Sequence, residues 1–144
     1  MPIRRAGPDD VPALARLRAA WTDEVADPEF EAEFARWWDA EAGRRAIWLA
    51  EVDGEPAGML TLAEYRRMPR PGRPAGCWGY VGNVFVLAEQ RDRGLGRALL
   101  DAVIAEARAR DYVRLVLAPS ERSIPLYRRA GFGAADGLLV LPLT

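Results

Sequence analysis

The residues best suited to chemistry lie in a turn between a predicted strand and a predicted helix. This turn contains Arg91, Arg93 and Arg97 together with Gly94 and Gly96. The first backbone N–H groups of a helix have no partner within it, and the helix dipole adds partial positive charge there. Glycines let an anion approach this backbone closely, and arginines can close on its edges. The spacing therefore predicts a phosphate site, and it suits two phosphates in a row best.

The chain lacks two residue types on which many enzymes depend. All 20 basic side chains among its 144 residues are arginine, and histidine is absent. This excludes Ser-His-Asp and Cys-His nucleophiles, lysine Schiff bases and histidine metal sites, so we expect no metal. Chemistry must rely on carboxylates, hydroxyls, arginine, backbone dipoles and the lone Cys77. Because no base is available to activate Cys77, we interpret it as a packed side chain and not as a nucleophile.

Length and charge restrict the roles to be considered. A chain of 144 residues fits one domain, residues 1–144. Its net charge of −1 argues against a nucleic-acid partner. No apolar run approaches the ~20 residues needed to span a membrane, and none follows the first residues as in a signal peptide. With one cysteine, the expected location is the cytoplasm.

Periodicity predicts helices first and then a hairpin. Residues 2–5 suit a short strand, and Pro8-Asp9-Asp10 reads as the start of a helix. A second helix is expected from Asp27 to Gly43, with an aromatic stripe that we interpret as core and that can also line a ligand site at its open end: Phe30, Phe34, Trp37 and Trp38. Period-two patterns then predict two strands, residues 46–52 and 57–65, joined by a tight turn at Asp53-Gly54.

The second half of the chain reads as an arginine-rich loop and then strand, helix and strand. The predicted elements are a loop at 66–76, a strand at 78–87, a helix at 94–110, a strand at 112–117, a short helix capped by Ser123 and ended by Gly131, and a last strand at 138–143. A strand–helix–strand unit after a hairpin implies an α/β fold of the α+β type, with a mixed sheet. We expect this sheet to be mostly antiparallel, with one parallel pair and helices on its sides.

Two motifs in this order resemble the signatures of the GNAT N-acetyltransferase superfamily. Arg91-x-x-Gly94-x-Gly96, after the strand Val84-Phe85-Val86, resembles its acetyl-CoA pyrophosphate loop. Tyr127-x-x-x-Gly131-Phe132 resembles its second signature, a tyrosine on a short helix before a Gly-Phe pair. The resemblance covers nearly the whole chain. It departs from the family at Ser120, where an asparagine that contacts the pantetheine arm is common, and at Ser123, where alanine is usual.

The resemblance implies a site for acetyl-CoA. The pantetheine arm would lie between two splayed strands and pair with Val84 and Val86, while a backbone N–H near Phe85 would polarise the thioester carbonyl. The loop would bind the pyrophosphate, and Ser120 would offer a hydrogen bond. The loop residues implied in this way are Arg91, Asp92, Arg93, Gly94, Leu95, Gly96 and Arg97. Tyr127 would contact the cofactor and protonate the leaving thiolate.

The group that takes the proton of the attacking amine is left open. Histidine is excluded, so the candidates are Glu64 at the end of a hairpin strand, an acid of the first two helices such as Glu24, or a water held by Asn83 and strand carbonyls. An amide cannot act as a base, so we assign Asn83 to orientation and name Glu64 as the candidate base.

The acceptor is expected to be a primary amine of a small molecule or peptide. The four arginines of the loop at 66–76, which the resembling fold would place near the acceptor, favour an acidic group on the acceptor or on a partner surface. Two alternatives remain open: a non-catalytic acyl-CoA-binding regulatory module, and acetylation of a protein N-terminus. A homodimer through the late strands is also expected.

Overall fold

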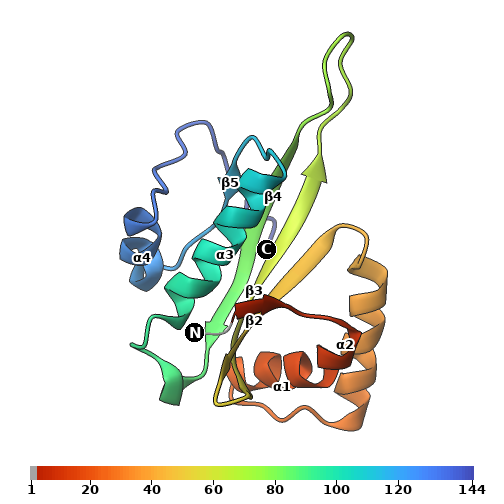
Figure 1. The fold of residues 1–144 in the computed structure, drawn as a ribbon, viewed down its shortest axis with the longest axis vertical. Coiled ribbons are helices and arrows are strands. Elements are labelled where there is room, and N and C mark those ends of the chain that lie inside the picture. The colour runs from red at the N-terminus through yellow and green to blue at the C-terminus, as the bar shows by residue number, and fades with distance from the viewer. Residues whose placement is uncertain (1–2) are drawn as a thin grey trace.

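The computed structural model of the protein describes residues 3–144. A short opening strand and two helices precede a hairpin, and a third long strand leads through a helix to a parallel partner strand (Figure 1). The strands are β1 (Ile3–Arg5), β2 (Arg45–Val52), β3 (Glu55–Arg66), β4 (Cys77–Val86) and β5 (Leu115–Val116). The helices are α1 (Val11–Trp21), α2 (Pro28–Glu41), α3 (Leu95–Ala109) and α4 (Ile124–Arg129), with 3-10 turns at Pro8–Asp10, Ala88–Gln90 and Glu121–Ser123.

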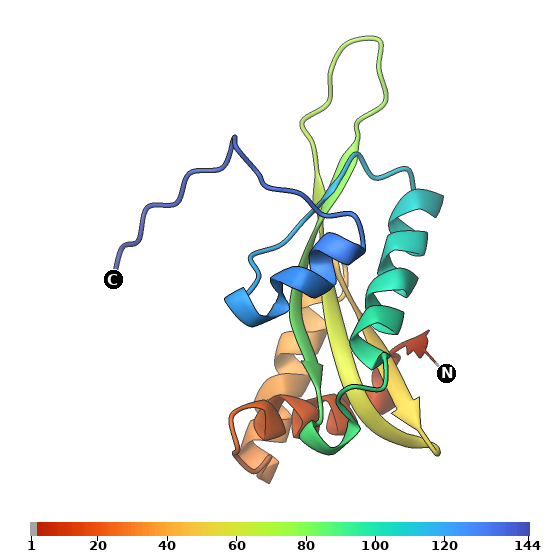
Figure 2. The same ribbon diagram turned by 90° about the vertical axis from the view of Figure 1, so that its left-hand side faces the viewer.

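The strands form one sheet in the order β1-β2-β3-β4-β5. The pairs from β1 to β4 are antiparallel, and β4 with β5 is parallel. Helix α3 covers one face of the sheet, while α1 and α2 cover the other (Figure 2). The predicted fold class, a mostly antiparallel mixed sheet with one parallel pair and flanking helices, is confirmed.

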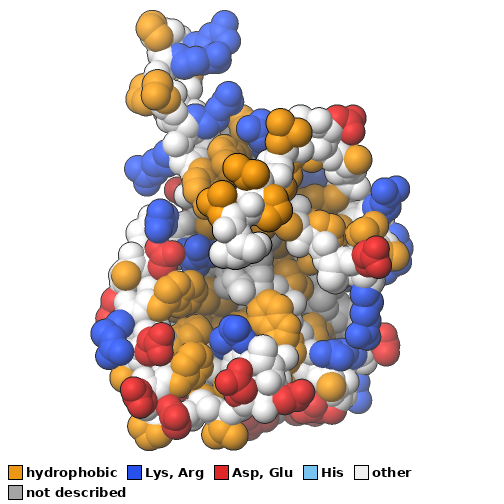
Figure 3. Space-filling view, turned by 180° about the vertical axis from the view of Figure 1, so that it is seen from behind, with side chains coloured by type: hydrophobic (Ala, Val, Ile, Leu, Met, Phe, Trp, Pro, Cys, Tyr) orange, Lys and Arg blue, Asp and Glu red, His pale blue; other side chains and the backbone are white. Residues whose placement is uncertain are grey.

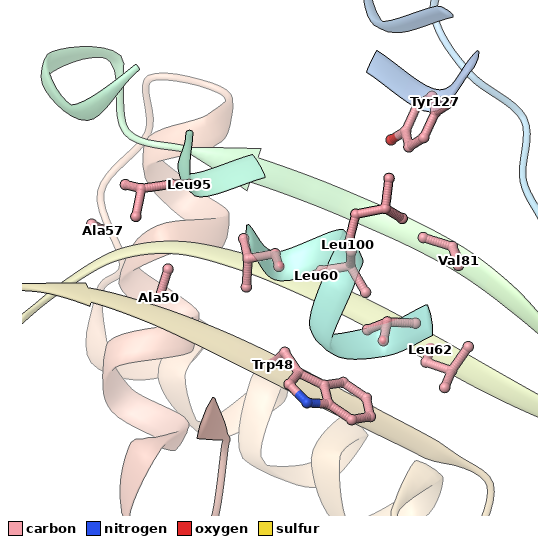
Figure 4. Packing of buried hydrophobic residues seen from close by; sticks show 11 residues of the cluster. Trp48, Ala50, Ala57, Leu60, Leu62, Val81, Leu95, Leu100 and Tyr127 are labelled. Carbon is pink, nitrogen blue, oxygen red and sulfur yellow. The ribbon is translucent and has the colours of Figure 1, made fainter. Parts of the chain in front are cut away.

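Each face of the sheet has its own hydrophobic core, because side chains alternate along β3. Leu60 and Leu62 point toward α3 and pack with Leu99 and Val103 (Figure 4). Met59, on the opposite face, packs in the core that α1 and α2 close with Leu14, Leu17 and Phe34. The aromatic stripe of α2 is therefore partly core, as predicted.

Side-chain hydrogen bonds at the starts of the first helices fix the path of the N-terminal part of the chain. The Asp10 carboxylate accepts hydrogen bonds from Arg4 at 2.7 and 2.8 Å and from the Gly7 amide at 2.8 Å. The bond from Arg4 is the main cause that lowers the pKa of Asp10 to about 2. Asp27 caps α2 through a hydrogen bond from the Phe30 amide at 2.8 Å. The tight turn at Asp53-Gly54 is also present, with both residues at positive φ.

Several predicted boundaries are wrong. Residues 138–143 are extended but pair with no strand among residues 3–144, so the predicted last strand is absent. The predicted strand at 112–117 shortens to Leu115–Val116. Ser123 precedes α4, but its hydroxyl donates to the Ser120 carbonyl at 2.9 Å, so it does not cap the helix. Pro2, placed in the first predicted strand, lies outside the described residues.

Residues 3–144 contain no helix that is both long and apolar enough to cross a membrane.

Candidate active site

A groove of about 570 Å³ opens where β4 and β5 separate. The two strands pair only at Gly79–Leu115 and Tyr80–Val116, and beyond these pairs they diverge. The groove is lined by eight residues that the sequence analysis predicts for the site: Asn83, Val84, Phe85, Val86, Arg91, Gly96, Ser120 and Tyr127. Residues far apart in the sequence thus meet along one side of β4.

The strand pair requires glycine at its closed end. A Cβ on Gly79 would lie 2.7 Å from the Leu62 side chain and 2.9 Å from those of Leu115 and Tyr112. Only glycine lets β5 approach β4 this closely while α3 packs above them. The short β5 then ends, and the backbone of β4 is left open toward the groove.

A β-bulge at Asn83 shapes the middle of the groove. Asn83 has φ +50°, and the register to β3 shifts between Met59 and Thr61, where β4 contains one extra residue. The Thr61 hydroxyl, buried beneath, lies 2.9 Å from the Gly82 carbonyl oxygen and 3.1 Å from Asn83 Oδ1. These contacts hold both the bulge and the Asn83 side chain in place.

Backbone groups of β4 beyond the bulge alternate between β3 and the groove. The Leu87 amide donates to the Ala57 carbonyl at 2.8 Å, and Phe85 lies opposite Met59 in the same ladder. By the alternation of an antiparallel pair, the N–H groups of Val84 and Val86 point away from β3. The open backbone donors therefore belong to the two valines that flank Phe85.

The Arg-Gly turn leads directly into α3. Gly94 is the N-cap with φ +80°, and the first amides of the helix have no side-chain cap. Arg91 lines the groove, and its Nε donates to the Val86 carbonyl at 3.2 Å. Gly96 lies in the first turn, where a Cβ would meet Leu126 only at an ordinary 3.7 Å. The fold itself leaves room for a side chain here.

The remaining residues of the turn differ in what they can offer. Asp92, at φ +62°, and Arg93 are exposed and lie outside the groove lining. Arg97 pairs with Asp101 at 2.8 Å. Leu95 is 2% exposed, so its side chain belongs to the core and only its backbone can bind a ligand. The predicted phosphate site thus consists of helix amides with arginines near its rim.

Tyr127 reaches the groove from α4. Its ring packs edge-on against Phe132, with 5.9 Å between the centroids, and its hydroxyl points from α4 toward β4 (Figure 4). Burial raises the pKa of Tyr127 above the usual value. Within residues 3–144 the hydroxyl has no hydrogen-bond partner. Ser120, in the segment between β5 and α4, also lines the groove, and its Oγ lies 3.0 Å from that of Ser123.

A second cavity, of about 360 Å³, lies on the face of the sheet that α1 and α2 cover and also reaches Asn83. Helix α2 lines it with Phe30, Phe34 and Trp37, and the buried Thr61 forms part of its floor. Hydrophobic side chains gather around the central hollow of this face (Figure 3).

The charged groups of this cavity are Arg18, Arg45 and Glu33. Arg45 pairs with Glu41 at 3.3 Å and lies over the Trp37 ring. Arg18 lies 5.2 Å over the Trp21 ring, and among residues 3–144 no carboxylate approaches it within ion-pair distance. The cavity therefore combines an aromatic wall with an arginine that has no anionic partner there.

The structure does not bring Glu64 to either cavity. Glu64 lies on the α3 face, where it accepts hydrogen bonds from Tyr112 at 2.8 Å and Arg110 at 2.7 Å. Its side chain is only 9% exposed. Burial, followed by the bond to Glu64, raises the pKa of Tyr112. Glu24 also lines neither cavity and instead accepts a hydrogen bond from the Thr22 hydroxyl.

The arginine-rich loop at 66–76 is a projecting arm at the far end of β3 and β4 (Figure 1). None of its residues lines the groove or the aromatic cavity. The resembling fold led us to expect this loop near the acceptor; in the structure, long strands carry it away from Asn83 and from both cavities.

With this geometry established, comparison with known proteins identifies the family. The sequence matches the acetyltransferase (GNAT) family over residues 11–132. The chain belongs to this family. Acetyl transfer to an amine, predicted from the two motifs, is confirmed as the activity of this GNAT acetyltransferase.

Two curated relatives are acetyltransferases of small amines. This GNAT acetyltransferase is 32% identical to the L-methionine sulfoximine/L-methionine sulfone acetyltransferase of Pseudomonas paraeruginosa, over 90% of the chain and 78% of that protein. It is 28% identical to glucosamine 6-phosphate N-acetyltransferase of Trypanosoma brucei brucei, over 67% of the chain and 64% of that protein. The second alignment thus spans slightly less than two thirds of the relative.

The fold is shared with solved structures. A predicted acetyltransferase of Clostridium acetobutylicum, solved with acetyl-CoA, superimposes with a TM-score of 0.77 at 23% identity, covering 99% of this chain and 96% of that one. This likeness supports the architecture of the GNAT acetyltransferase from end to end.

Most of the residues that line the aromatic cavity were not predicted from the sequence. Glu33 follows Phe30 by three residues and precedes Trp37 by four, so it belongs to the same helical stripe. A charged residue within an aromatic stripe was the signal in the sequence that could have indicated this cavity. Arg18 and Thr61 gave none, because their place depends on how α1 packs on the sheet.

Proposed function

We propose that the protein transfers the acetyl group of acetyl-CoA directly to the amine of a small amino-carboxylate with an apolar body, such as an amino acid. One observation carries this proposal: the groove between β4 and β5 and the aromatic cavity beside α2 both have Asn83 in their lining. Donor and acceptor can therefore be bound at once, with their reacting atoms close to the bulge.

The residues that line the groove suit acetyl-CoA. The pantetheine arm would pair with the free N–H groups of Val84 and Val86, and its pyrophosphate would reach the first turn of α3. There the backbone amides from Gly94 onward and the guanidinium of Arg91 supply donors and positive charge. Ser120 would contact the arm from the opposite wall.

The side chains around the bulge fit the needs of acyl transfer. The amine nitrogen attacks the thioester carbon, and an N–H such as that of Val84 stabilises the oxyanion. The C–S bond then breaks, and Tyr127 donates its proton to the leaving thiolate. The amine gives its proton, through a water held near Asn83, to the carboxylate of Glu33, which lines the same cavity. Glu64, on the other face, takes no part.

The acceptor class follows from the chemistry of the aromatic cavity. Phe30, Phe34 and Trp37 suit an apolar body, and Arg18 suits a carboxylate. Both curated relatives are named for acceptors that contain an amine and an anionic group, a carboxylate in one and a phosphate in the other. Because the wall of this cavity is mainly apolar and aromatic, we favour an amino acid over a sugar phosphate as the acceptor.

An acceptor panel combined with one variant tests the proposal. Thiol release from acetyl-CoA is followed with apolar amino acids, their methyl esters, glucosamine 6-phosphate and a polyamine. Arg18→Gln should raise KM for the amino acids roughly 10- to 100-fold, the range of one charge-assisted hydrogen bond, and leave KM for the esters nearly unchanged. Arg16→Gln, an exposed arginine on the same helix, is the control.

Two results would contradict this proposal. Equal effects of Arg18→Gln on acids and esters would remove the carboxylate site. Tight acetyl-CoA binding without transfer to any amine would favour a non-catalytic acyl-CoA-binding module.

A further inference from the structure

Thr61 is a polar side chain in an otherwise apolar core. It is 2% exposed, and no other polar or charged residue among residues 3–144 is buried to this degree. Burying a hydroxyl group costs free energy unless hydrogen bonds replace those that it made with water. Valine has nearly the same shape and would avoid this cost. The Thr61 hydroxyl is therefore expected to serve a purpose beyond packing.

The Thr61 hydroxyl has two polar neighbours but only one proton. Its Oγ1 lies 2.9 Å from the Gly82 carbonyl oxygen and 3.1 Å from Asn83 Oδ1. A carbonyl oxygen can only accept, whereas a hydroxyl donates one hydrogen bond and can accept others. With oxygens on both sides, one of the two contacts would contain no proton. One neighbour must therefore supply a donor, and only the amide of Asn83 is able to do so.

A half-turn of the Asn83 amide satisfies both contacts. The half-turn exchanges Oδ1 and Nδ2 and keeps the shape of the side chain. The NH2 group then donates to Thr61 Oγ1, and the Thr61 hydroxyl donates to the Gly82 carbonyl. The hydrogen bonds thus follow each other in one direction, from amide to hydroxyl to carbonyl, and the buried hydroxyl is satisfied as both donor and acceptor.

This orientation decides what Asn83 offers to a ligand. Asn83 is exposed and lines both the groove and the aromatic cavity. With its NH2 group bound to Thr61, the amide turns its oxygen toward this space. An oxygen accepts a hydrogen bond from an amine N–H and leaves the lone pair of the nitrogen free to attack. An NH2 group in the same place would instead donate to that lone pair and block it.

From these contacts we infer that Thr61 is a positioning residue for acetyl transfer, because its hydroxyl holds the Asn83 amide with the oxygen toward the acceptor amine. Thr61 acts through Asn83 and not on the amine itself. The inference rests on the proposed function, which places the amine beside Asn83.

Substitutions at both positions test this inference. Thr61→Val removes the hydroxyl but keeps the shape, so it should lower kcat about 10-fold, the range of one hydrogen bond, and leave the Kd of acetyl-CoA within about twofold. Thr61→Ser keeps the hydroxyl and should retain kcat within about threefold. In an Asn83→Asp background the carboxylate presents an oxygen on either side, so adding Thr61→Val should lower kcat by no more than about twofold.

The comparison of the two backgrounds separates positioning from packing. A residue that only packs would cause the same loss of kcat in both backgrounds. That result, or a wild-type kcat for Thr61→Val, would overturn the inference.

Neutron diffraction from a deuterated crystal of the wild-type protein tests the orientation without a variant and without activity. Deuterium atoms should lie on the atom of the Asn83 amide that faces Thr61, and an oxygen at that place would overturn the inference. A wild-type protein that acetylates no amino acid would contradict the proposed function instead, while the neutron structure would still decide the orientation of Asn83.

Discussion

The Tyr127 side chain lines the groove, and its hydroxyl has no hydrogen-bond partner within residues 3–144. A hydroxyl that only anchored its helix would be expected to donate to a backbone or side-chain oxygen. Tyr127 instead points toward β4, beside the groove that we assign to acetyl-CoA (Figure 4). Burial raises its pKa, so the phenol keeps its proton at neutral pH and can donate it to a thiolate.

We predict that Tyr127→Phe lowers kcat about 100-fold, the usual contribution of a general acid, and leaves the Kd of acetyl-CoA within about twofold. Because the pKa of Tyr127 is raised, the acid form persists as pH rises, and kcat of the wild type should not fall until above pH ~10. Steady-state kinetics across pH and calorimetric titration with acetyl-CoA measure the two quantities.

Tyr112→Phe is the matched control, since Tyr112 bonds Glu64 away from both cavities. It should leave kcat unchanged. A Tyr127→Phe enzyme with wild-type kcat would show that the thiolate receives its proton elsewhere.

Single residues could be predicted from the sequence only where a local motif defines them. The Arg-Gly turn follows from spacing along the chain, and Tyr127 follows from the resemblance of its motif to a family signature. Glu64 lies away from the groove and the aromatic cavity, and the sequence does not reveal this, because the pattern gives the period of a strand but not which of its faces meets a ligand. The bulge at Asn83 could not be predicted for a similar reason, since the extra residue in β4 becomes visible only when β3 is placed beside it.

At the scale of the element, the two glycines at the start of α3 have different roles, one in folding and one in binding. Gly94 has φ +80°, a conformation that disfavours any Cβ. Gly96 is helical, and its nearest neighbour beyond the helix leaves room for a Cβ. The fold therefore requires glycine at the first position, while at the second the close approach of a phosphate would require it.

We predict opposite effects for alanine at these two glycines. Gly94→Ala should lower the free energy of unfolding by about 1–2 kcal/mol, because its backbone is left-handed. Gly96→Ala should leave stability unchanged or raise it by up to about 1 kcal/mol, yet weaken acetyl-CoA binding at least 10-fold. Urea unfolding and calorimetry measure the two effects, and unimpaired binding by Gly96→Ala would contradict the phosphate site.

Elements with strong periodicity were predictable, and those that depend on a partner were not. The hairpin, α2 and α3 follow from apolar spacing and turn residues that lie close together in the chain. β5 shortens because its length is set by where β4 diverges. Residues 138–143 have a strand pattern, but a strand needs a neighbour, and this chain does not supply one to itself.

At the scale of the whole molecule, the two substrates have separate binding places that meet at one residue. The groove between β4 and β5 and the aromatic cavity beside α2 both reach Asn83, so neither substrate needs to leave before the other arrives. A covalent acyl-enzyme would serve no purpose in this arrangement. Cys77 is also badly placed for one, because it starts β4 opposite Arg66 and lines neither cavity.

We therefore predict sequential kinetics, with double-reciprocal plots that intersect when acetyl-CoA and acceptor are both varied. Ping-pong kinetics, with parallel lines, would require an acylated side chain. Cys77→Ser should retain kcat and both KM values within about twofold, because the half-buried thiol acts only as packing. Mass spectrometry after incubation with acetyl-CoA alone should show no added acetyl group. An acetylated Cys77 peptide with parallel plots would instead place the transfer at the far end of β4, away from Asn83, and would overturn the ternary complex on which the assignment of the two cavities rests.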